Sequence, residues 1–267
     1  MKKLLVLFAG LTCHSLYASP VLSPNAAAVH TDGVFFCDDC SCWSLRAGFR
    51  GDYVFDRKLT LTADQSIMIT STTSIMSNEG VLTFNLWDRL DIYGLVGAAN
   101  SSNSGVYSVP PLSPFLVGAE SAQTIWGVGA RATLLEYNFG CCGTSYVGAD
   151  INYESIGSSN TNNVTINHAP VPSTSPIAVN SVNYKELQVS LQVGHKIAML
   201  TPYIAAKWSN AGLASSDRIG NRYLRNTGNH WGYAVGVLLI DAGRMSVTAE
   251  ARFIDEKAMT IMGEFRF

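Results

Sequence analysis

Three cysteines stand close together near the start of the chain, in the stretch FCDDCSCW at residues 36–43. Closely spaced thiols can hold a metal, form a redox centre or make disulfides. Cys37 and Cys40 have a C-x-x-C spacing, but a structural zinc site needs four ligands and His30 is the only histidine nearby. A thioredoxin-like site would lie in a βαβ context, which this stretch lacks. The choice among these chemistries therefore depends on the compartment and on the elements that carry the thiols.

The first 18 residues have the three parts of a secretory signal peptide. Lys2 and Lys3 provide the positive start, residues 4–11 form a short apolar stretch, and SLYA precedes the cleavage site. We expect residues 1–18 to be removed and residues 19–42 to form a periplasmic segment that carries the cysteine cluster. Without the two lysines the chain has 16 basic and 20 acidic residues, a balance that does not favour a nucleic-acid partner.

The composition indicates a membrane protein that lacks membrane helices. Only 14% of the residues are charged, whereas 47% are hydrophobic. Beyond the signal peptide the longest apolar run is 231–240, which is far shorter than the about 20 residues that a membrane helix needs. Without such helices, only a closed β-barrel satisfies every backbone hydrogen bond inside a bilayer.

Alternation of apolar and polar residues supports a barrel. From Met245 to Phe253 every second residue is apolar and the residues between them are polar, as in a strand with one lipid-facing side. The same alternation recurs at 44–55, 126–134, 146–154 and 186–193, with weaker examples at 58–69, 81–87, 90–99, 202–208 and 230–240. The chain closes on Phe265 and Phe267, which resembles the assembly signal of outer-membrane barrels. The predicted fold is an all-β, transmembrane antiparallel barrel of the bacterial outer-membrane type over residues 43–267.

The number of strands and the two ends of the barrel follow from these segments. They give eleven strands, whereas single-chain bacterial barrels have an even number. We therefore expect about twelve strands, with one more within 58–80 or 209–229, and 14 to 16 if long loops contain further strands. If the last strand ends in the periplasm, the turns lie there and the longer connections lie outside. The expected turns are 88–89, 139–143, 196–201 and 241–243, and the expected external connections are 100–122, 155–182 and 209–229.

Five blocks of the sequence resemble the chlamydial major outer membrane porin family. In chain order they are CDDCSCWSLRAGFRGDYVFDR, LWDRLDIYGLVGAAN, WGVGARATLLE, QVSLQVGHKIAMLTPYIAAKWS and VTAEARFIDEKAMTIMGEFRF. Together they cover most of the chain from Cys37 onward. The chain departs from the family in its shorter length and in the adjacent Cys141 and Cys142, where the family has C-x-C. These departures suggest a shortened paralogue.

The resemblance implies a porin in the bacterial outer membrane that lets small solutes and ions diffuse through. It also implies homo-trimers and disulfide cross-links to other cysteine-rich envelope proteins, which would stiffen the envelope. An alternative function is a mainly structural, disulfide-linked envelope component with little channel activity. About twelve strands would make a narrow pore, because roughly 16 to 18 strands are needed for a wide aqueous channel.

Charged side chains on the inner wall of a barrel set its ion preference. The alternation predicts that eleven such residues line the pore: Arg46, Arg50, Asp52, Arg131, Asp150, Glu154, Glu186, Glu250, Arg252, Glu264 and Arg266. The stretch DRIGNRYLR adds Arg218, Arg222 and Arg225, which either narrow the pore mouth or belong to an external, solvated loop.

Catalytic and cofactor sites have little support in the sequence. GVGARA at 127–132, with Asp150 downstream, matches a dinucleotide-binding pattern. However, the stretch alternates as a strand and no amphipathic helix follows, so we interpret its glycines as relief of crowding on the inner face. The mature histidines are scattered, and no nucleophile and base can be paired from their spacing. We therefore expect no enzyme activity, no cofactor and no metal.

Export makes disulfides the expected chemistry of the cysteines. The candidates are Cys37, Cys40, Cys42, Cys141 and Cys142. In the predicted barrel the first strand begins on the periplasmic side, where the 139–143 turn also lies, so both cysteine groups should face one compartment. Because five cysteines cannot all pair with one another, at least one thiol should remain for a neighbouring protein.

Overall fold

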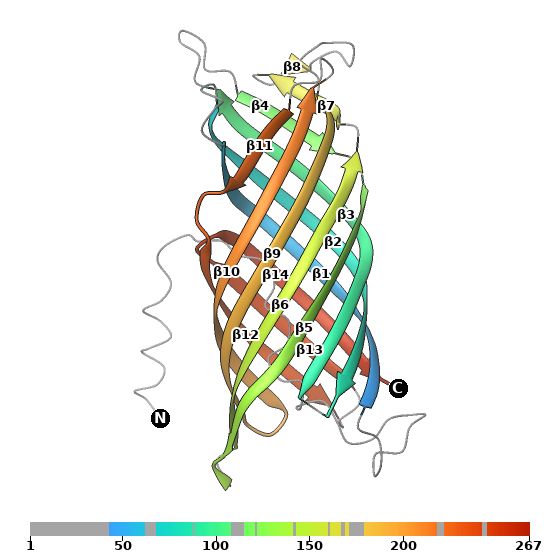
Figure 1. The fold of residues 1–267 in the computed structure, drawn as a ribbon, viewed down its shortest axis with the longest axis vertical. Helices are drawn as coiled ribbons and strands as arrows, with labels where there is room; N and C mark the ends of the chain where they lie inside the picture. The colour runs from blue at the N-terminus through green and yellow to red at the C-terminus, as the bar shows by residue number, and fades with distance from the viewer. Residues whose placement is uncertain are drawn as a thin grey trace.

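The computed structural model consists of β-strands wound around a single lumen (Figure 1). The structure describes residues 43–61, 68–87, 89–107, 115–120, 122–140, 143–159, 161–166, 169–170, 179–217, 222–241 and 245–267. The predicted segments at 1–18 and 19–42 and all five disulfide candidates lie outside these residues. Within the described residues, no helix is both long and apolar enough to cross a membrane.

Ten antiparallel strands pair into a closed ring. In ring order they are β1 (Trp43–Leu61), β2 (Met68–Leu86), β3 (Leu90–Tyr107), β5 (Gln123–Asn138), β6 (Thr144–Ser159), β9 (Val179–Lys196), β10 (Leu200–Asp217), β12 (Trp231–Asp241), β13 (Met245–Phe253) and β14 (Glu256–Arg266). The ring closes between its first and last strands, where Arg46 lies opposite Arg266. The prediction of an antiparallel barrel is confirmed.

The ten strands of the ring are near but not equal to the expected number of about twelve, since the described part of the predicted segment 58–69 does not form a strand of its own. Instead β1 continues to Leu61 through a bulge between Val54 and Asp56, and β2 begins only at Met68. The bulge inserts one residue and so shifts the alternation by one position. The eleven expected strands therefore become ten, and the even number that bacterial barrels require is kept.

A short strand, β11 (Arg222–Thr227), replaces three strands near one end of the barrel. It pairs with β10 through Gly212 and Asn226 and with β1 through Leu59 and Thr227. Here eight strands encircle the lumen, because β11 stands in place of β12, β13 and β14. The loss of two strand spacings shortens the circumference by about 10 Å and the diameter by about 3 Å.

This strand corrects the expectation that the arginine-rich stretch is a loop. Arg222 and Arg225 are residues of strand β11, and Arg218 lies outside the described residues. The other long connections also contain strands: β4 (Phe115–Glu120), β7 (Thr161–Ile166) and β8 (Ala169–Pro170) extend the sheet beyond β3.

The short turns gather at the end where the chain terminates (Figure 1). Trp87, Phe139 and Ala198 lie in these turns, and the Phe267 N–H donates a 3.0 Å hydrogen bond to the Leu45 carbonyl at the same end. The described strands of the longer connections, β4, β7, β8 and β11, lie toward the opposite end (Figure 1). This arrangement agrees with the predicted division into short turns and long connections.

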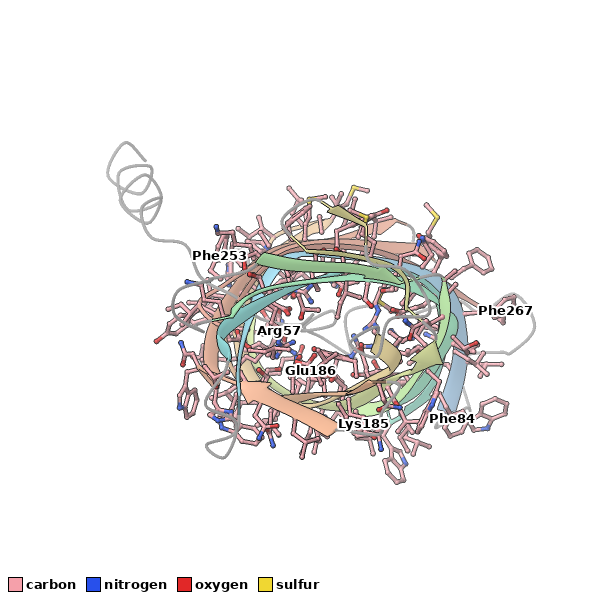
Figure 2. All side chains as sticks on the ribbon, turned by 90° about the horizontal axis from the view of Figure 1, so that it is seen from above. Arg57, Phe84, Lys185, Glu186, Phe253 and Phe267 are labelled. Carbon is pink, nitrogen blue, oxygen red and sulfur yellow. The ribbon has the colours of Figure 1, made fainter. Side chains whose placement is uncertain are left out.

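The outer wall is apolar, whereas the inner wall carries the buried charged and polar side chains together with an apolar cluster that includes Leu59, Ile75 and Ile125. Phe84, Phe253 and Phe267 project outward from the ring, whereas Arg57 and Glu186 project into the lumen (Figure 2). Exposed aromatic side chains lie near the strand ends, as at Trp43 and Phe84, whose rings stack with centroids 5.8 Å apart. An apolar band bordered by aromatic residues is characteristic of barrels that span an outer membrane.

Three inward tyrosines lie over glycines of neighbouring strands. The pairs are Tyr93 with Gly129, Tyr146 with Gly194, and Tyr203 with Gly236. A Cβ atom at Gly129 would lie 2.3 Å from the Tyr93 ring, so only glycine fits beneath it. GVGARA is therefore part of strand β5, and its second glycine makes room for an aromatic ring.

Candidate functional site: an ion-paired lumen

All eleven charged residues predicted to face inward are buried in the barrel interior. They are Arg46, Arg50, Asp52, Arg131, Asp150, Glu154, Glu186, Glu250, Arg252, Glu264 and Arg266. They come from six strands of the ring, β1, β5, β6, β9, β13 and β14, and each stands at a position that alternates with outward-facing residues. The structure brings most of them into ion pairs with one another or with charged residues that the sequence prediction missed.

Six further charged side chains face the lumen: Arg57, Glu79, Asp91, Lys207, Asp255 and Glu256. The bulge hid Arg57, because the alternation before Val54 assigns position 57 to the outer face. Lys207 follows Tyr203 and Ala205 at two-residue intervals, which is a signal that sequence reasoning could have used. In total, ten acidic and seven basic side chains are buried among the described residues.

Near the turn end, Asp91 lies between two arginines. Its Oδ2 pairs with Arg46 and lies 2.7 Å from Arg131 Nη2. The Asn85 side-chain amide donates a 2.7 Å hydrogen bond to the other carboxylate oxygen. Because three neighbouring strands and β1 supply these groups, the cluster ties one side of the ring together.

Farther along the lumen, Arg50 reaches from β1 to two carboxylates. It pairs with Glu79 on β2 and, at 2.9 Å, with Glu154 on β6, four strands away around the ring. Asp52 accepts hydrogen bonds from Arg252 at 2.5 Å and Thr260 at 2.6 Å. The arginines of β1 therefore extend into the lumen rather than lying flat along their own strand.

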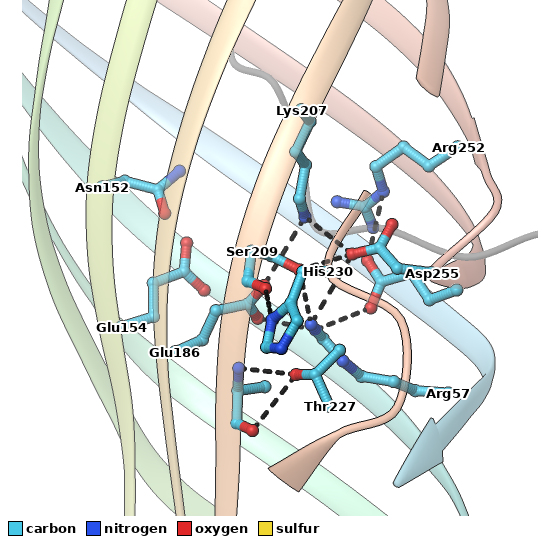
Figure 3. A network of polar contacts seen from close by, with 12 residues as sticks. Arg57, Asn152, Glu154, Glu186, Lys207, Ser209, Thr227, His230, Arg252 and Asp255 are labelled. Carbon is cyan, nitrogen blue, oxygen red and sulfur yellow. Dashed lines mark hydrogen bonds and ion pairs between the residues drawn. The ribbon is translucent and has the colours of Figure 1, made fainter. Parts of the chain in front are cut away.

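The densest cluster lies where β11 takes over from the three shorter strands (Figure 3). We call Arg57, Glu186, Lys207, Asp255 and Glu256 the seam cluster. Arg57 Nη1 lies 2.8 Å from Glu186 Oε2 and 2.9 Å from Glu256 Oε2. Lys207 Nζ lies 3.5 Å from Glu186 Oε1 and 3.7 Å from Asp255 Oδ2.

Neutral groups complete the hydrogen bonds of the seam cluster. Arg57 also donates to the Tyr184 hydroxyl at 2.7 Å and to Ser209 Oγ at 3.1 Å. Ser209 in turn donates to Asp255 at 2.5 Å, and Tyr184 donates to Glu186 at 2.8 Å. The cluster joins β1, β9, β10 and β14 across the lumen.

A strained turn positions the acidic residues of the seam cluster. Ile254, between β13 and β14, has a φ of 100°, which is a rare conformation for a β-branched residue. Asp255 and Glu256 follow at once, and both are buried in the lumen. The sequence prediction made no assignment for residues 254–256, so it missed both carboxylates.

The wall formed by β9 and β10 also carries neutral hydrogen-bonding groups. Gln192 and Thr201 are buried, and their side-chain polar atoms have no hydrogen-bond partner among the described residues. Amide and hydroxyl groups in this position can bind water or a polar solute that enters the lumen.

Groups suited to catalysis or metal binding do not gather in the described part of the chain. No cluster of three or more histidine, cysteine, aspartate or glutamate side chains there could hold a metal. Ser145 Oγ does lie 2.8 Å from His195 Nδ1. These residues are cross-strand neighbours beside the exposed ring of Phe139, and they are separate from the ion-paired lumen.

Comparison with known proteins identifies the family of this barrel. The family described as Chlamydia major outer membrane protein matches residues 1–75, 168–228 and 223–267. The chain belongs to this family. Family membership places the protein in the bacterial outer membrane and supports a channel rather than an enzyme.

Chlamydial porins align with this chain over its whole length. The major outer membrane porin of Chlamydia pneumoniae is 27% identical over 395 aligned positions, with 100% of both chains covered. The corresponding protein of Chlamydia psittaci is 28% identical over 398 positions, and serovar F of Chlamydia trachomatis is 26% identical over 400, again with complete coverage. Since this chain has 267 residues, the relatives contain segments that have no counterpart in it.

Solved outer-membrane barrels are similar at a coarser level. The beta domain of the Bordetella autotransporter Brka has a TM-score of 0.44 and 7% identity, covering 85% of this chain and 100% of its own. OprG from Pseudomonas aeruginosa has a TM-score of 0.36 and 10% identity, and the match covers 84% of this chain and 95% of OprG. The ten-strand architecture of this family member is therefore established by its own strand pairing.

Proposed function

We propose that this chain is a narrow porin whose lumen conducts small solutes and ions across the outer membrane. The observation that supports the proposal best is the row of buried, ion-paired charges inside a closed ring with an apolar outer wall. A barrel that served only as a membrane anchor would not need seventeen charged side chains in its interior. The porin names of the relatives agree with this function.

The balance of interior charges supports a preference for cations. Ten acidic and seven basic groups are buried among the described residues. A net negative wall attracts cations and repels anions at short range, most strongly at low ionic strength. The eight-strand level near the seam cluster further restricts the size of solutes, because a ring of about eight strands encloses little more space than its own side chains fill.

Single-channel recording in planar bilayers tests this function. The purified, folded chain should give small, stepwise currents, and a salt gradient should give a reversal potential of the sign expected for cation preference. The same preparation, denatured by heat, is the control. A correctly folded barrel that gives no current would overturn the porin proposal.

A second proposed function is disulfide linkage within the envelope. It is supported by the positions of the described residues next to both cysteine groups. Trp43 follows Cys42 directly, and Gly140 and Gly143 flank Cys141 and Cys142. Trp43, Gly140 and Gly143 lie at the end of the barrel that contains the short turns. Both cysteine groups would then face the same compartment.

Gel electrophoresis of envelopes tests this linkage. Without reductant the protein should run as high-mass species, and reductant should return it to the monomer. Serine at Cys141 and Cys142 should reduce the high-mass species while the barrel still folds. A protein that runs only as a monomer without reductant would contradict the linkage, and chemical cross-linking of the reduced barrel would separately test for the proposed trimer.

A further inference from the structure

The partners of Arg57 lie on two different sides of the lumen. Glu256 on β14 is the direct cross-strand neighbour of Arg57, so this pair stays on one part of the wall. Glu186 is on β9, which is three strands away by way of β11 and β10 and five strands away around the wider ring. The Arg57–Glu186 pair therefore crosses the lumen, whereas the Arg57–Glu256 pair does not.

Narrowing of the barrel at β11 explains how a single side chain reaches the opposite wall. Leu59, two residues beyond Arg57, already pairs with β11. Glu186 pairs with Ala211, whose backbone N–H donates a 2.7 Å hydrogen bond to Thr227 of β11. Both partners thus lie beside the strand that shortens the circumference.

Each partner keeps an opposite charge on its own side if the crossing pair separates. Arg57 would retain Glu256 at 2.9 Å and Asp255 at 3.8 Å. Glu186 would retain Lys207 and the hydroxyl of Tyr184. Breaking a buried pair is costly mainly when it leaves an uncompensated charge. Here no charge is left alone, so the crossing pair can open without that penalty.

We propose that the Arg57–Glu186 pair is a latch that sets how wide the solute pathway is. This inference rests on the proposed porin function. In the latched state the guanidinium occupies the centre of the narrow level. In the released state it lies along β1 and β14 beside Glu256, and the pathway is wider. Release breaks the ion pair of Arg57 with Glu186 and its hydrogen bonds to Tyr184 and Ser209. The two states would appear as two conductance levels in one channel.

A matched pair of charge-neutralising variants tests the latch. E186Q removes the far partner and leaves Arg57 its partners on its own wall. Loss of this contact should raise the ratio of wide to narrow conductance dwell times by about tenfold, which corresponds to one charge-assisted hydrogen bond. E256Q changes the charge count equally but keeps the crossing contact, so this ratio should stay within about twofold of the unmodified chain. Folding of both variants is checked by the heat-dependent shift in gel mobility that barrels show.

The outcomes separate the latch from the porin function itself. If the unmodified chain conducts and E186Q has the same levels and dwell times, the latch is overturned while the porin function stands. The latch would also be overturned if E256Q raised the ratio of wide to narrow dwell times as much as E186Q does, because the effect would then come from the loss of charge alone. Silence of the folded unmodified chain would overturn the porin function and, with it, the latch that rests on it.

Discussion

Replacing Gly129 with alanine should destabilise the barrel through one identifiable clash. The added Cβ would lie 2.3 Å from Tyr93 Cζ and 2.4 Å from its hydroxyl oxygen, so the tyrosine ring must move. Its movement breaks the 3.0 Å hydrogen bond that the hydroxyl donates to Asp150. It also displaces the ring from beneath Arg131, whose guanidinium carbon lies 5.8 Å from the ring centroid.

The size of this effect can be worked out from the lost contacts. Overpacking a well-filled site costs about 1–3 kcal/mol. A hydrogen bond to a charged group contributes about 1.5–3 kcal/mol. Alanine recovers about 0.4–1 kcal/mol by restricting the unfolded chain. The free energy of unfolding should therefore fall by about 1.5–5.5 kcal/mol.

Urea titration of the barrel refolded in detergent or lipid vesicles measures this change. Gly80→Ala is a matched control, because Gly80 is exposed and its added Cβ would make only an ordinary contact, 3.8 Å from the Val96 carbonyl oxygen. Tyr93→Ala should remove most of the cost of Gly129→Ala, since the clash needs the ring. If Gly129→Ala and Gly80→Ala unfold at the same urea concentration, the tyrosine does not constrain the glycine.

Three further predictions follow from other parts of the barrel. Glycine at Ile254 should give a barrel more stable than alanine there by about 1 kcal/mol, since the φ of 100° strains any residue with a Cβ; urea titration showing alanine as the better residue would contradict this. Asp91→Asn should lower the free energy of unfolding by about 3 kcal/mol, because it leaves two buried arginines without their shared carboxylate. Asp56→Asn is the control, since Asp56 pairs with Lys257 at a partly exposed site, and it should lower the free energy of unfolding by less than about 1 kcal/mol in the same assay. Phe267→Ala should lower the fraction of protein that reaches the folded, heat-modifiable form in cells, and an unchanged fraction would argue against the terminal aromatic residue as an assembly signal.

Alternation alone predicted the barrel and the faces of its clearest strands. Glu186, Gln188 and Gln192 follow one another at even positions of β9, and all are buried. The intervening Leu187 and Leu191 are exposed on the outer wall. This pattern can be read from the sequence because each residue of a regular strand turns its side chain to the face opposite to that of the residue before it.

The parts that escaped prediction are those where this rule is interrupted. The bulge before Asp56 reverses the facing of Arg57, and sequence patterns do not reveal where one extra residue enters a ladder. The turn at Ile254 requires a positive φ, and an isoleucine in the sequence does not predict this conformation. β11 is short and polar, and only its pairing with both β10 and β1 makes it a strand. The seam cluster lies beside the bulge, the Ile254 turn and β11, which explains why Arg57 at its centre was not predicted.

Closure of the ring by β1 and β14 means that the barrel cannot be finished until the last strand of the ring is available to pair with the first. β1 is available early, but its partner β14 spans Glu256–Arg266, about 200 residues later in the chain. Until then β1 presents an unpaired edge, which is the kind of surface on which chains aggregate. Contacts between such distant parts of a sequence form slowly. Loss of β14 would leave open edges on β1 and β13, so a barrel without this strand is expected to aggregate.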